Sequence, residues 1–144
     1  MANKKGRITG LGGIFFKAKD PKATKQWYDE HFSLGTDQYG KSFQWYDLND
    51  KEKICHTQWS AMKDDTDYFD PGKQDYMINY RVENLEELIE ELKTKGVKQV
   101  GGLDKYDYGK FAWVLDPDGN KIELWEPVDQ VFTDMEEEKK KAEK

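Results

Sequence analysis

Glu123 is the residue whose type and position most directly suggest chemistry. It follows the turn-forming segment 116–120, in a stretch of alternating apolar and polar residues. Alternate residues of a strand share a face, so the Glu123 carboxylate lies on the same face as the indole of Trp125. A carboxylate that faces an aromatic cavity is suited to proton transfer. The structural alternative is that Glu123 pairs with Lys17 or Arg81, or reaches solvent at the edge of the sheet.

Cysteine and histidine side chains are the other candidates for chemistry. Cys55 and His56 are adjacent in a strand-like segment, so they point to opposite faces. Cys55 is interpreted as a small buried hydrophobic residue rather than a reactive thiolate, because its own face offers no histidine to activate it. His56 is interpreted as a surface or edge-strand residue rather than a metal ligand or base. His31 lies near the end of a predicted helix, where it can interact with the last carbonyl groups.

Composition excludes several classes of function. The chain has 144 residues, which suits one domain or two small modules that share a core. The formal net charge is −6 and the sequence pI is about 5.0, which argues against nucleic acid or an anionic membrane as a partner. Apolar runs are only a few residues long, which is too short to span a bilayer.

Cysteine usage and the start of the chain indicate a compartment. Cys55 is the single cysteine, so an internal disulfide is impossible. Residues Met1–Arg7 lead directly into a strand-like segment without the apolar region of a signal peptide. We therefore expect a cytoplasmic protein, kept in a reducing environment.

An internal repeat organises the chain. The segment 14–20 matches the segment 78–84, with isoleucine opening both, and we call this the strand match. Each copy is an alternating strand that ends in an Asx residue, Asp20 or Asn84, and these residues favour helix N-caps. The sequence therefore predicts a strand followed by a helix in each half.

A second part of the repeat, which we call the hairpin match, has a slightly larger spacing between its copies. Phe43–Trp45 matches Phe111–Trp113, and Lys53–Ile54 matches Lys121–Ile122. Two or three antiparallel strands are thus predicted after each helix. The expected organisation is a first module over residues 1–62, a linker over 63–75, a second module over 76–127 and a charged C-terminal tail over 128–144.

These features resemble the glyoxalase, bleomycin resistance protein and extradiol dioxygenase superfamily, also called vicinal oxygen chelate proteins. The resemblance covers about residues 8 to 127 and includes the hairpin Phe111–Glu126. It implies an α+β fold of two paired βαβββ modules, whose curved mixed sheets enclose a cavity. Members of this superfamily include lyases, isomerases, dioxygenases and binding proteins, so the resemblance indicates the fold more strongly than the function.

The resemblance also implies four pseudo-symmetric points at which many members hold a metal. Carried onto this sequence, these points fall on Gly13, Cys55, Met77 and Glu123. Glycine has no side chain, and a thioether suits Cu(I) rather than the divalent ions of this superfamily. Two remaining ligands are fewer than a divalent site normally needs. We therefore expect no cofactor; the alternative is a divalent metal held by Glu123 and His56.

Aromatic side chains indicate a pocket. Most of the tryptophans fall on predicted strands, and a subset on a concave face would line a site for a planar or apolar molecule. Trp59 has the strand parity of Cys55, and Trp125 has the parity of Glu123. Tyr108 lies in the lengthened loop of the second copy and can act as a lid. The predicted pocket therefore consists of Cys55, Trp59, Met77, Tyr108 and Trp125.

Two functions compete at this stage. The first is a small-molecule-binding protein without a complete metal site, which binds or sequesters an aromatic or hydrophobic compound. The alternative is a glyoxalase-like lyase or isomerase in which Glu123 acts as the base, with or without a metal. A pure protein-interaction module explains neither Glu123 nor the aromatic residues. For both functions we expect a homodimer, because two small modules leave sheet edges and apolar faces uncovered.

Overall fold

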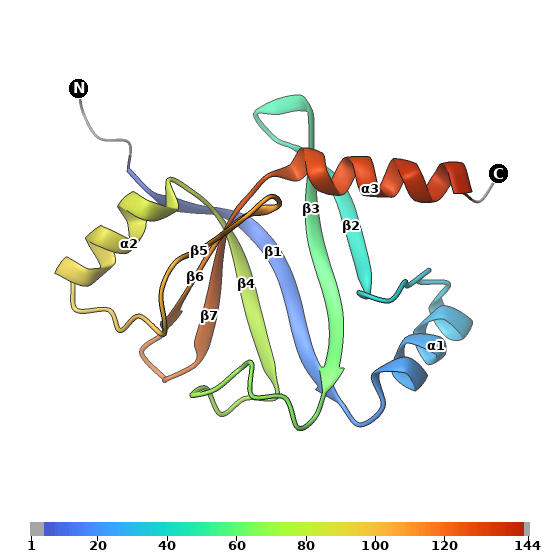
Figure 1. Cartoon of the computed structure of the whole chain (residues 1–144), viewed down its shortest axis with the longest axis horizontal. Coiled ribbons are helices and arrows are strands. Elements are labelled where there is room, and N and C mark those ends of the chain that lie inside the picture. The colour runs from blue at the N-terminus through green and yellow to red at the C-terminus, as the bar shows by residue number, and fades with distance from the viewer. Residues whose placement is uncertain (1–4, 143–144) are drawn as a thin grey trace.

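The computed structural model describes residues 5–142 and shows one curved, open sheet flanked by three helices (Figure 1). The strands are β1 (Arg7–Ala18), β2 (Lys41–Asp47), β3 (Asp50–Lys63), β4 (Tyr76–Glu83), β5 (Asp104–Tyr106), β6 (Gly109–Leu115) and β7 (Lys121–Pro127). The helices are α1 (Pro21–Phe32), α2 (Leu85–Thr94) and α3 (Asp129–Ala142). The predicted α+β class is confirmed. Parts of the predicted first module (residues 1–4) and tail (residues 143–144) lie outside the described residues.

The sheet has the strand order β2-β3-β1-β4-β7-β6-β5 and an internal pseudo-twofold axis. Strands β1 and β4 are antiparallel neighbours at its centre, and Ile14 pairs with Ile78. On either side of this pair, Gly13 pairs with Asn79 and Phe15 pairs with Met77. The repeat relates Gly13 to Met77 and Phe15 to Asn79, so it converts each of these two pairs into the other. The strand match in the sequence therefore agrees with the pairing of β1 and β4 about the pseudo-twofold axis.

The two hairpins repeat internally but are placed differently. Trp45 pairs with Cys55 in the first hairpin, and Trp113 pairs with Glu123 in the second, in agreement with the hairpin match. On the central strands, however, Ile14 pairs with Trp59. Its counterpart Ile78 pairs with Ile122, which the hairpin match equates with Ile54 rather than with Trp59. Strand β3 is thus displaced along β1 by an odd number of positions, and an odd displacement exchanges the two faces of a strand.

The first two helices begin differently from each other. Asp20 caps α1 as predicted, because its side chain accepts a hydrogen bond from the Ala23 backbone at 3.1 Å. The predicted Asn84 cap of α2 is wrong. Asn84 adopts a left-handed backbone conformation, and its side chain donates to the Lys5 carbonyl instead. The Glu126 carboxylate accepts from the Leu85 amide at 2.8 Å and so takes over the capping role.

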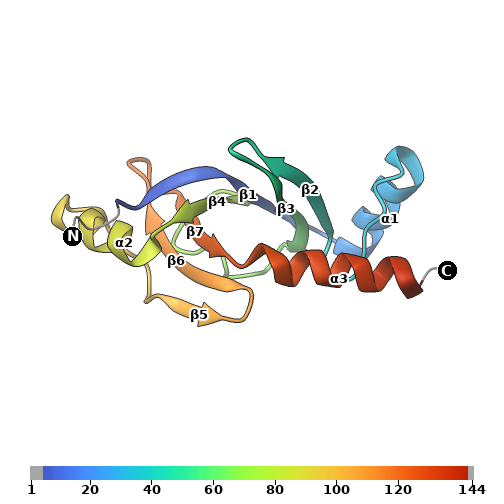
Figure 2. The ribbon, with the colours of Figure 1, turned by 90° about the horizontal axis from the view of Figure 1, so that it is seen from above.

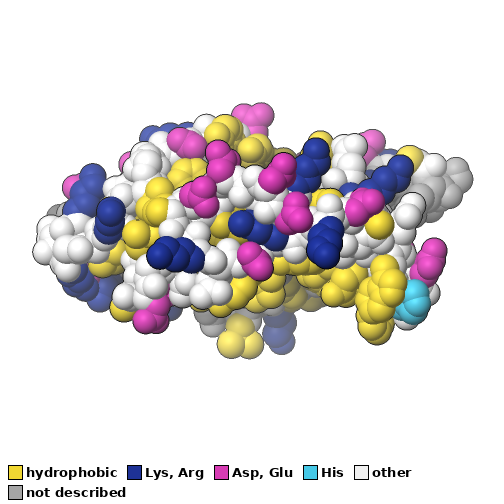
Figure 3. Space-filling view, turned by 90° about the horizontal axis from the view of Figure 1, so that it is seen from below, with side chains coloured by type: hydrophobic (Ala, Val, Ile, Leu, Met, Phe, Trp, Pro, Cys, Tyr) yellow, Lys and Arg dark blue, Asp and Glu magenta, His cyan; other side chains and the backbone are white. Residues whose placement is uncertain are grey.

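Only the second half has a helix packed firmly on its sheet. Leu85 and Ile89 of α2 are buried against β6 and β7 in the main core cluster. In α1, by contrast, none of residues Pro21–Phe32 is buried in the described chain. Trp27 remains 48% exposed and Phe32 64% exposed. Figure 3 shows apolar side chains gathered at the end of the molecule where α1 lies.

The predicted charged tail begins with a structural element that matters for the site. Residues Asp129–Ala142 form α3, which lies against β3 across the hollow of the sheet (Figures 1 and 2). Its apolar positions face the sheet, and its acidic and basic residues form local ion pairs such as Lys139 with Glu136. Among the described residues, no helix combines the length and the apolar character needed to cross a membrane.

Candidate functional site

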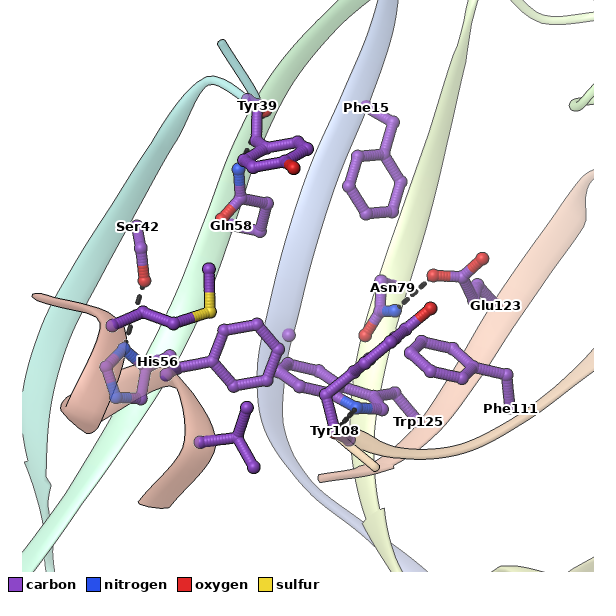
Figure 4. Close-up of a pocket in the computed structure, with 14 residues that line it drawn as sticks. Phe15, Tyr39, Ser42, His56, Gln58, Asn79, Tyr108, Phe111, Glu123 and Trp125 are labelled. Atoms are coloured by element: carbon purple, nitrogen blue, oxygen red, sulfur yellow. Dashed lines mark hydrogen bonds between the residues drawn. The ribbon is translucent and has the colours of Figure 1, made fainter. Parts of the chain in front are cut away.

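A cavity of about 420 Å³ lies between the sheet and α3 (Figure 4). Side chains from β1, β3, β4 and β7 form its floor, and those from β2, β6, α3 and the loop between β5 and β6 form its walls. Its volume is in the range of small-molecule sites in proteins. The lining is mostly apolar, and its polar groups are concentrated on the floor.

The floor is built from one row of paired residues. Gln58, Gly13, Asn79 and Glu123 are successive Cα partners across β3, β1, β4 and β7. Residues paired in this way project from the same face of the sheet, so the three side chains of this row reach the cavity together. Gly13 in the middle of the row lets the Phe15 ring lie close to the backbone, because a Cβ atom there would lie 3.1 Å from that ring.

Glu123 is 3% exposed and holds a dense set of hydrogen bonds. The Asn79 amide donates to its Oε1 atom at 2.5 Å, and the Trp113 indole donates to its Oε2 atom at 2.8 Å. The Tyr68 hydroxyl also donates to Oε2. These contacts occupy three of the roughly four lone-pair positions of a carboxylate. The proposed pairing with Lys17 or Arg81 is absent among the described contacts, since Arg81 pairs with Asp129 instead.

Tyr68 comes from the segment between β3 and β4 and covers Glu123. Burial and the negative charge of Glu123 raise the pKa of the Tyr68 hydroxyl far above its usual value. The hydroxyl therefore stays protonated and keeps donating to the carboxylate. Lys121 lies beside this pair, with its ammonium group 5.1 Å from the Tyr68 ring centroid, and burial lowers its pKa.

Asn79 is the buried polar group whose hydrogen bonds are incomplete. It is 1% exposed, and its Oδ1 atom has no partner among the described residues. Because the Glu123 carboxylate accepts from the Asn79 amide nitrogen, the amide cannot turn round without losing that bond. A Cβ atom on Gly12 would overlap this oxygen, so glycine is required at that position.

Aromatic rings form one wall of the cavity. The Phe111 and Trp125 rings are stacked with centroids 6.0 Å apart, and Phe132 of α3 meets Trp125 edge-on at 5.3 Å. The Trp125 indole donates to the Tyr108 carbonyl at 3.2 Å, which holds the loop against the wall. Gly109 permits this approach, because a Cβ atom there would lie 2.5 Å from the indole nitrogen and the backbone φ is +141°.

His56 joins the sheet to α3. Its Nδ1 atom lies 3.0 Å from the Ser42 hydroxyl and its Nε2 atom 3.0 Å from the Thr133 hydroxyl, and the residue is 1% exposed. Burial lowers the pKa of the imidazole below its usual value. His56 is therefore a neutral residue that lines the cavity and fixes the position of α3.

The chain matches the model of the Glyoxalase/Bleomycin resistance protein/Dioxygenase superfamily over residues 10–124. The protein belongs to this superfamily. A search of curated proteins finds no matching relative.

Solved structures share the fold at low sequence identity. Methylmalonyl-CoA epimerase from Mycobacterium tuberculosis aligns with 18% identity and a TM-score of 0.57, over 92% of this chain and 97% of that chain. A variant of the Streptomyces coelicolor epimerase in complex with 2-nitronate-propionyl-CoA aligns with 12% identity and a TM-score of 0.62, over 85% and 96%. A superfamily member from Vibrio splendidus aligns with 10% identity and a TM-score of 0.51, over 81% and 98%.

The residues of this glyoxalase-superfamily protein do not fit the divalent metal centre found in many members. Under the pseudo-twofold relation, Asn79 corresponds to Phe15 and Glu123 corresponds to Ser60. The Phe15 ring has no donor atom, and Ser60 Oγ donates to the Tyr39 carbonyl. Among residues 5–142, no group of three or more His, Cys, Asp and Glu side chains is arranged to share a metal ion.

The displacement of β3 along β1 decides where several predicted site residues lie. Cys55 and Trp59 belong to the face of β3 that points away from the cavity, so their predicted place in the pocket is wrong. Trp59 packs against Phe16 and Tyr28 of α1, with ring centroids 5.1 and 4.9 Å apart. Cys55 is buried, and burial raises the pKa of its thiol, which makes it unreactive.

The same displacement brings His56 into the cavity, contrary to the interpretation as a surface residue. Of the other predicted pocket residues, Trp125 and Tyr108 line the cavity, and so does Glu123. Met77 is 1% exposed and lies in a neighbouring cluster with Phe15 and Phe69 rather than at the cavity surface.

Several residues that build the site were missing from the predicted set, among them Gln58, Tyr68, Asn79, Trp113 and Phe132. Asn79 carries a signal in the sequence, since a single amide interrupts an apolar strand in which its repeat counterpart is Phe15. Tyr68 and Phe132 carry no such signal, because their roles depend on how the connecting segment and α3 fold back over the sheet.

The stability of the protein should depend on pH through His56. The ordinary pKa of histidine is 6.5, and the pKa of His56 in the folded protein is lower. At pH values between the two, His56 binds a proton in the unfolded chain but not in the folded protein. The free energy of unfolding should therefore fall as the pH drops below about 6.5 and level off below the folded-state pKa. Urea unfolding at several pH values measures this slope. The His56→Gln variant should lose this dependence on pH, and the His31→Gln variant, at an exposed position, should keep it. An unchanged slope in His56→Gln would show that His56 is not the group that titrates.

Proposed function

We propose that this protein binds or sequesters a small aromatic or hydrophobic compound in the cavity beneath α3, without a complete metal site. The observation that carries the proposal is the cavity itself, which combines a stacked aromatic wall with a few buried polar groups on its floor. Such a combination is typical of small-molecule sites, in which apolar contact supplies affinity and a few polar groups fix orientation. Helix α3 supports the proposal, because it covers the cavity with Val131, Phe132 and Met135.

Binding of a neutral apolar dye tests this proposal. Nile red should bind with a rise in fluorescence, and the Phe132→Ala variant should bind it about tenfold more weakly, because the lost ring contact corresponds to roughly 50 Å² of apolar area. The Trp27→Ala variant is the matched control, since Trp27 is exposed on α1 and does not line the cavity. Equal affinity in all three proteins would show that the dye binds elsewhere, and the proposal would fail.

The alternative is a lyase or isomerase in which Glu123 removes a proton from carbon. Its support is that Glu123 lines the cavity and that the structural neighbours include methylmalonyl-CoA epimerases. Against it, three donors already hold the carboxylate. These donors leave only about one of the four lone-pair positions of the carboxylate to reach a substrate. Deuterium uptake by methylmalonyl-CoA in D₂O above the rate without protein, lost in Glu123→Gln, would favour the alternative.

The homodimer stays a prediction. The exposed aromatic residues of α1 support it, because a second copy would cover them.

A further inference from the structure

The polar floor of the cavity presents hydrogen-bond acceptors. The Gln58 amide nitrogen lies within hydrogen-bond distance of the Tyr39 carbonyl at 2.9 Å and of the Ser60 hydroxyl at 3.1 Å. Its Oε1 atom, by contrast, has no hydrogen-bond partner among residues 5–142. Glu123 and Asn79 also face the cavity, and each retains oxygen lone pairs that no protein donor occupies. The three side chains stand in one row across the sheet, with Asn79 and Glu123 on neighbouring strands and Gln58 beyond Gly13 of β1.

Asn79 Oδ1 is the acceptor with the strongest need for a partner. A buried amide oxygen without a hydrogen bond destabilises the fold, and native proteins contain few such atoms. The usual remedy, turning the amide, is blocked because the amide nitrogen donates to Glu123 at 2.5 Å. No donor among residues 5–142 reaches this oxygen, so it is left to accept from a group that enters the cavity.

Charge restricts the ligand further. No lysine or arginine is among the described residues that line the cavity, while the Glu123 carboxylate is. The nearby Arg81 is neutralised by a bidentate pair with Asp129 at 2.6 and 2.7 Å. His56 has both ring nitrogens engaged by hydroxyl groups. An acidic ligand would therefore meet the Glu123 carboxylate and no cation of the cavity lining, since Lys121 lies beside Tyr68 and Glu123 but outside that lining.

Resting on the proposed function, we infer that the ligand is a flat aromatic molecule with an N–H donor, neutral or cationic, that hydrogen-bonds to Asn79 Oδ1. The ring stacks along the wall of Phe111, Trp125 and Phe132, where rings already meet at stacked and edge-on angles. Its N–H group points to the acceptor row on the floor. A positive charge on the ligand is accommodated by Glu123 and by the faces of the aromatic rings.

Three small probes separate the parts of this inference. Indole carries an N–H donor, benzofuran has nearly the same shape with an oxygen in its place, and indole-3-carboxylate adds a negative charge. Titrations followed by the nitrogen–proton spectrum of the Trp125 indole should give an affinity for indole about tenfold above that for benzofuran. Indole-3-carboxylate should bind at least tenfold more weakly than indole.

Substitution of Asn79 tests the proposed contact. In the Asn79→Ala variant, the affinity ratio of indole to benzofuran should fall from about ten to about one. The ratio is informative because a general loosening of the cavity would weaken both probes alike. The Asn49→Ala variant, in the exposed turn between β2 and β3, is the matched control and should keep the ratio.

The outcomes are distinct. If neither indole nor benzofuran perturbs the Trp125 signal, and Nile red also fails to bind, the proposed function is wrong. If both probes bind with equal affinity to the unmodified protein, the cavity takes aromatic ligands but the inferred donor contact is wrong. Preferential binding of indole-3-carboxylate would overturn the charge argument. The probe comparison needs no variant, so it decides the inference even if Asn79→Ala does not fold.

Discussion

Replacing Glu123 with leucine is expected to lower the free energy of unfolding by about 3–5 kcal/mol. The leucine side chain leaves the Tyr68 hydroxyl, the Asn79 amide and the Trp113 indole without their acceptor. Each buried donor that loses its partner costs about 1–3 kcal/mol, and the total falls below the sum because the cavity lets water reach some of them. Urea unfolding with an unchanged m-value measures the loss.

The Glu123→Gln variant is the matched control, and it should cost about 1 kcal/mol or less. Its amide oxygen can accept from Tyr68 and Trp113, as Oε2 of Glu123 does. Its amide nitrogen can then donate to Asn79 Oδ1 once the Asn79 amide turns round; Asn79 Nδ2 takes the place that lacks a partner, so the number of unsatisfied groups does not rise. If the leucine variant were as stable as the glutamine variant, the hydrogen-bond set around Glu123 would not stabilise the fold.

Much of the architecture follows from local patterns in the sequence. In the hairpin Phe111–Glu126, the Asp116 side chain accepts from the Asp118 and Asn120 amides, and Gly119 adopts a φ of +83°. These turn residues fix the register of β6 and β7, and therefore the face on which Glu123 lies. The strand match likewise agrees with the central pairing of Ile14 with Ile78.

The errors came from relations between elements that are far apart in the sequence. The hairpin match predicts the pairing within each hairpin correctly, but it does not determine the register of the first hairpin against β1. The displacement of β3 turns Cys55 and Trp59 away from the cavity and brings in His56 and Gln58. The pattern of alternating residues cannot reveal this displacement, because both faces of β3 carry polar and apolar residues in a mixed order.

The tail was the other limit of sequence reasoning. The run of glutamate and lysine residues at the end of the tail suits either an extended helix or a frayed, solvated end. Neither interpretation predicts that Val131, Phe132 and Met135 face the cavity. The anchor of the helix also depends on tertiary structure. Arg81 of β4 and Asp129 of α3 are distant in the sequence and meet only when the helix folds back over the sheet.

Breaking this anchor should have an effect comparable to the loss of Glu123. The guanidinium of Arg81 donates to both carboxylate oxygens of Asp129, and the two side chains are 4% and 9% exposed. Arg81 also lies 5.3 Å from the Trp45 ring centroid and 5.6 Å from that of Trp125, so it cannot leave for solvent without disrupting the packing. The Asp129→Ala variant leaves this cation buried and unpaired, which typically costs about 3–5 kcal/mol.

The loss should be seen in two measurements on the same variant. Urea unfolding should show the decrease in stability, and amide hydrogen exchange should show faster exchange in α3, since the helix loses its link to β4. Nile red binding should weaken with it, because Phe132 and Met135 are held over the cavity by the same helix. The Asp134→Ala variant, at an exposed position of α3 where Asp134 contacts Gln130, should change stability by less than about 0.5 kcal/mol.

A double variant shows whether the unpaired charge is the cause. In Arg81→Met with Asp129→Leu, two apolar side chains of similar volume replace the ion pair, and much of the stability should return. A double variant as unstable as Asp129→Ala would mean that the hydrogen bond from Arg81 to the His56 carbonyl at 3.2 Å, rather than the pair itself, holds the sheet and the helix together. Equal exchange rates in α3 for Asp129→Ala and the unmodified protein would instead show that the other links of the helix, Thr133 with His56 and Lys139 with Asp37, keep it over the cavity.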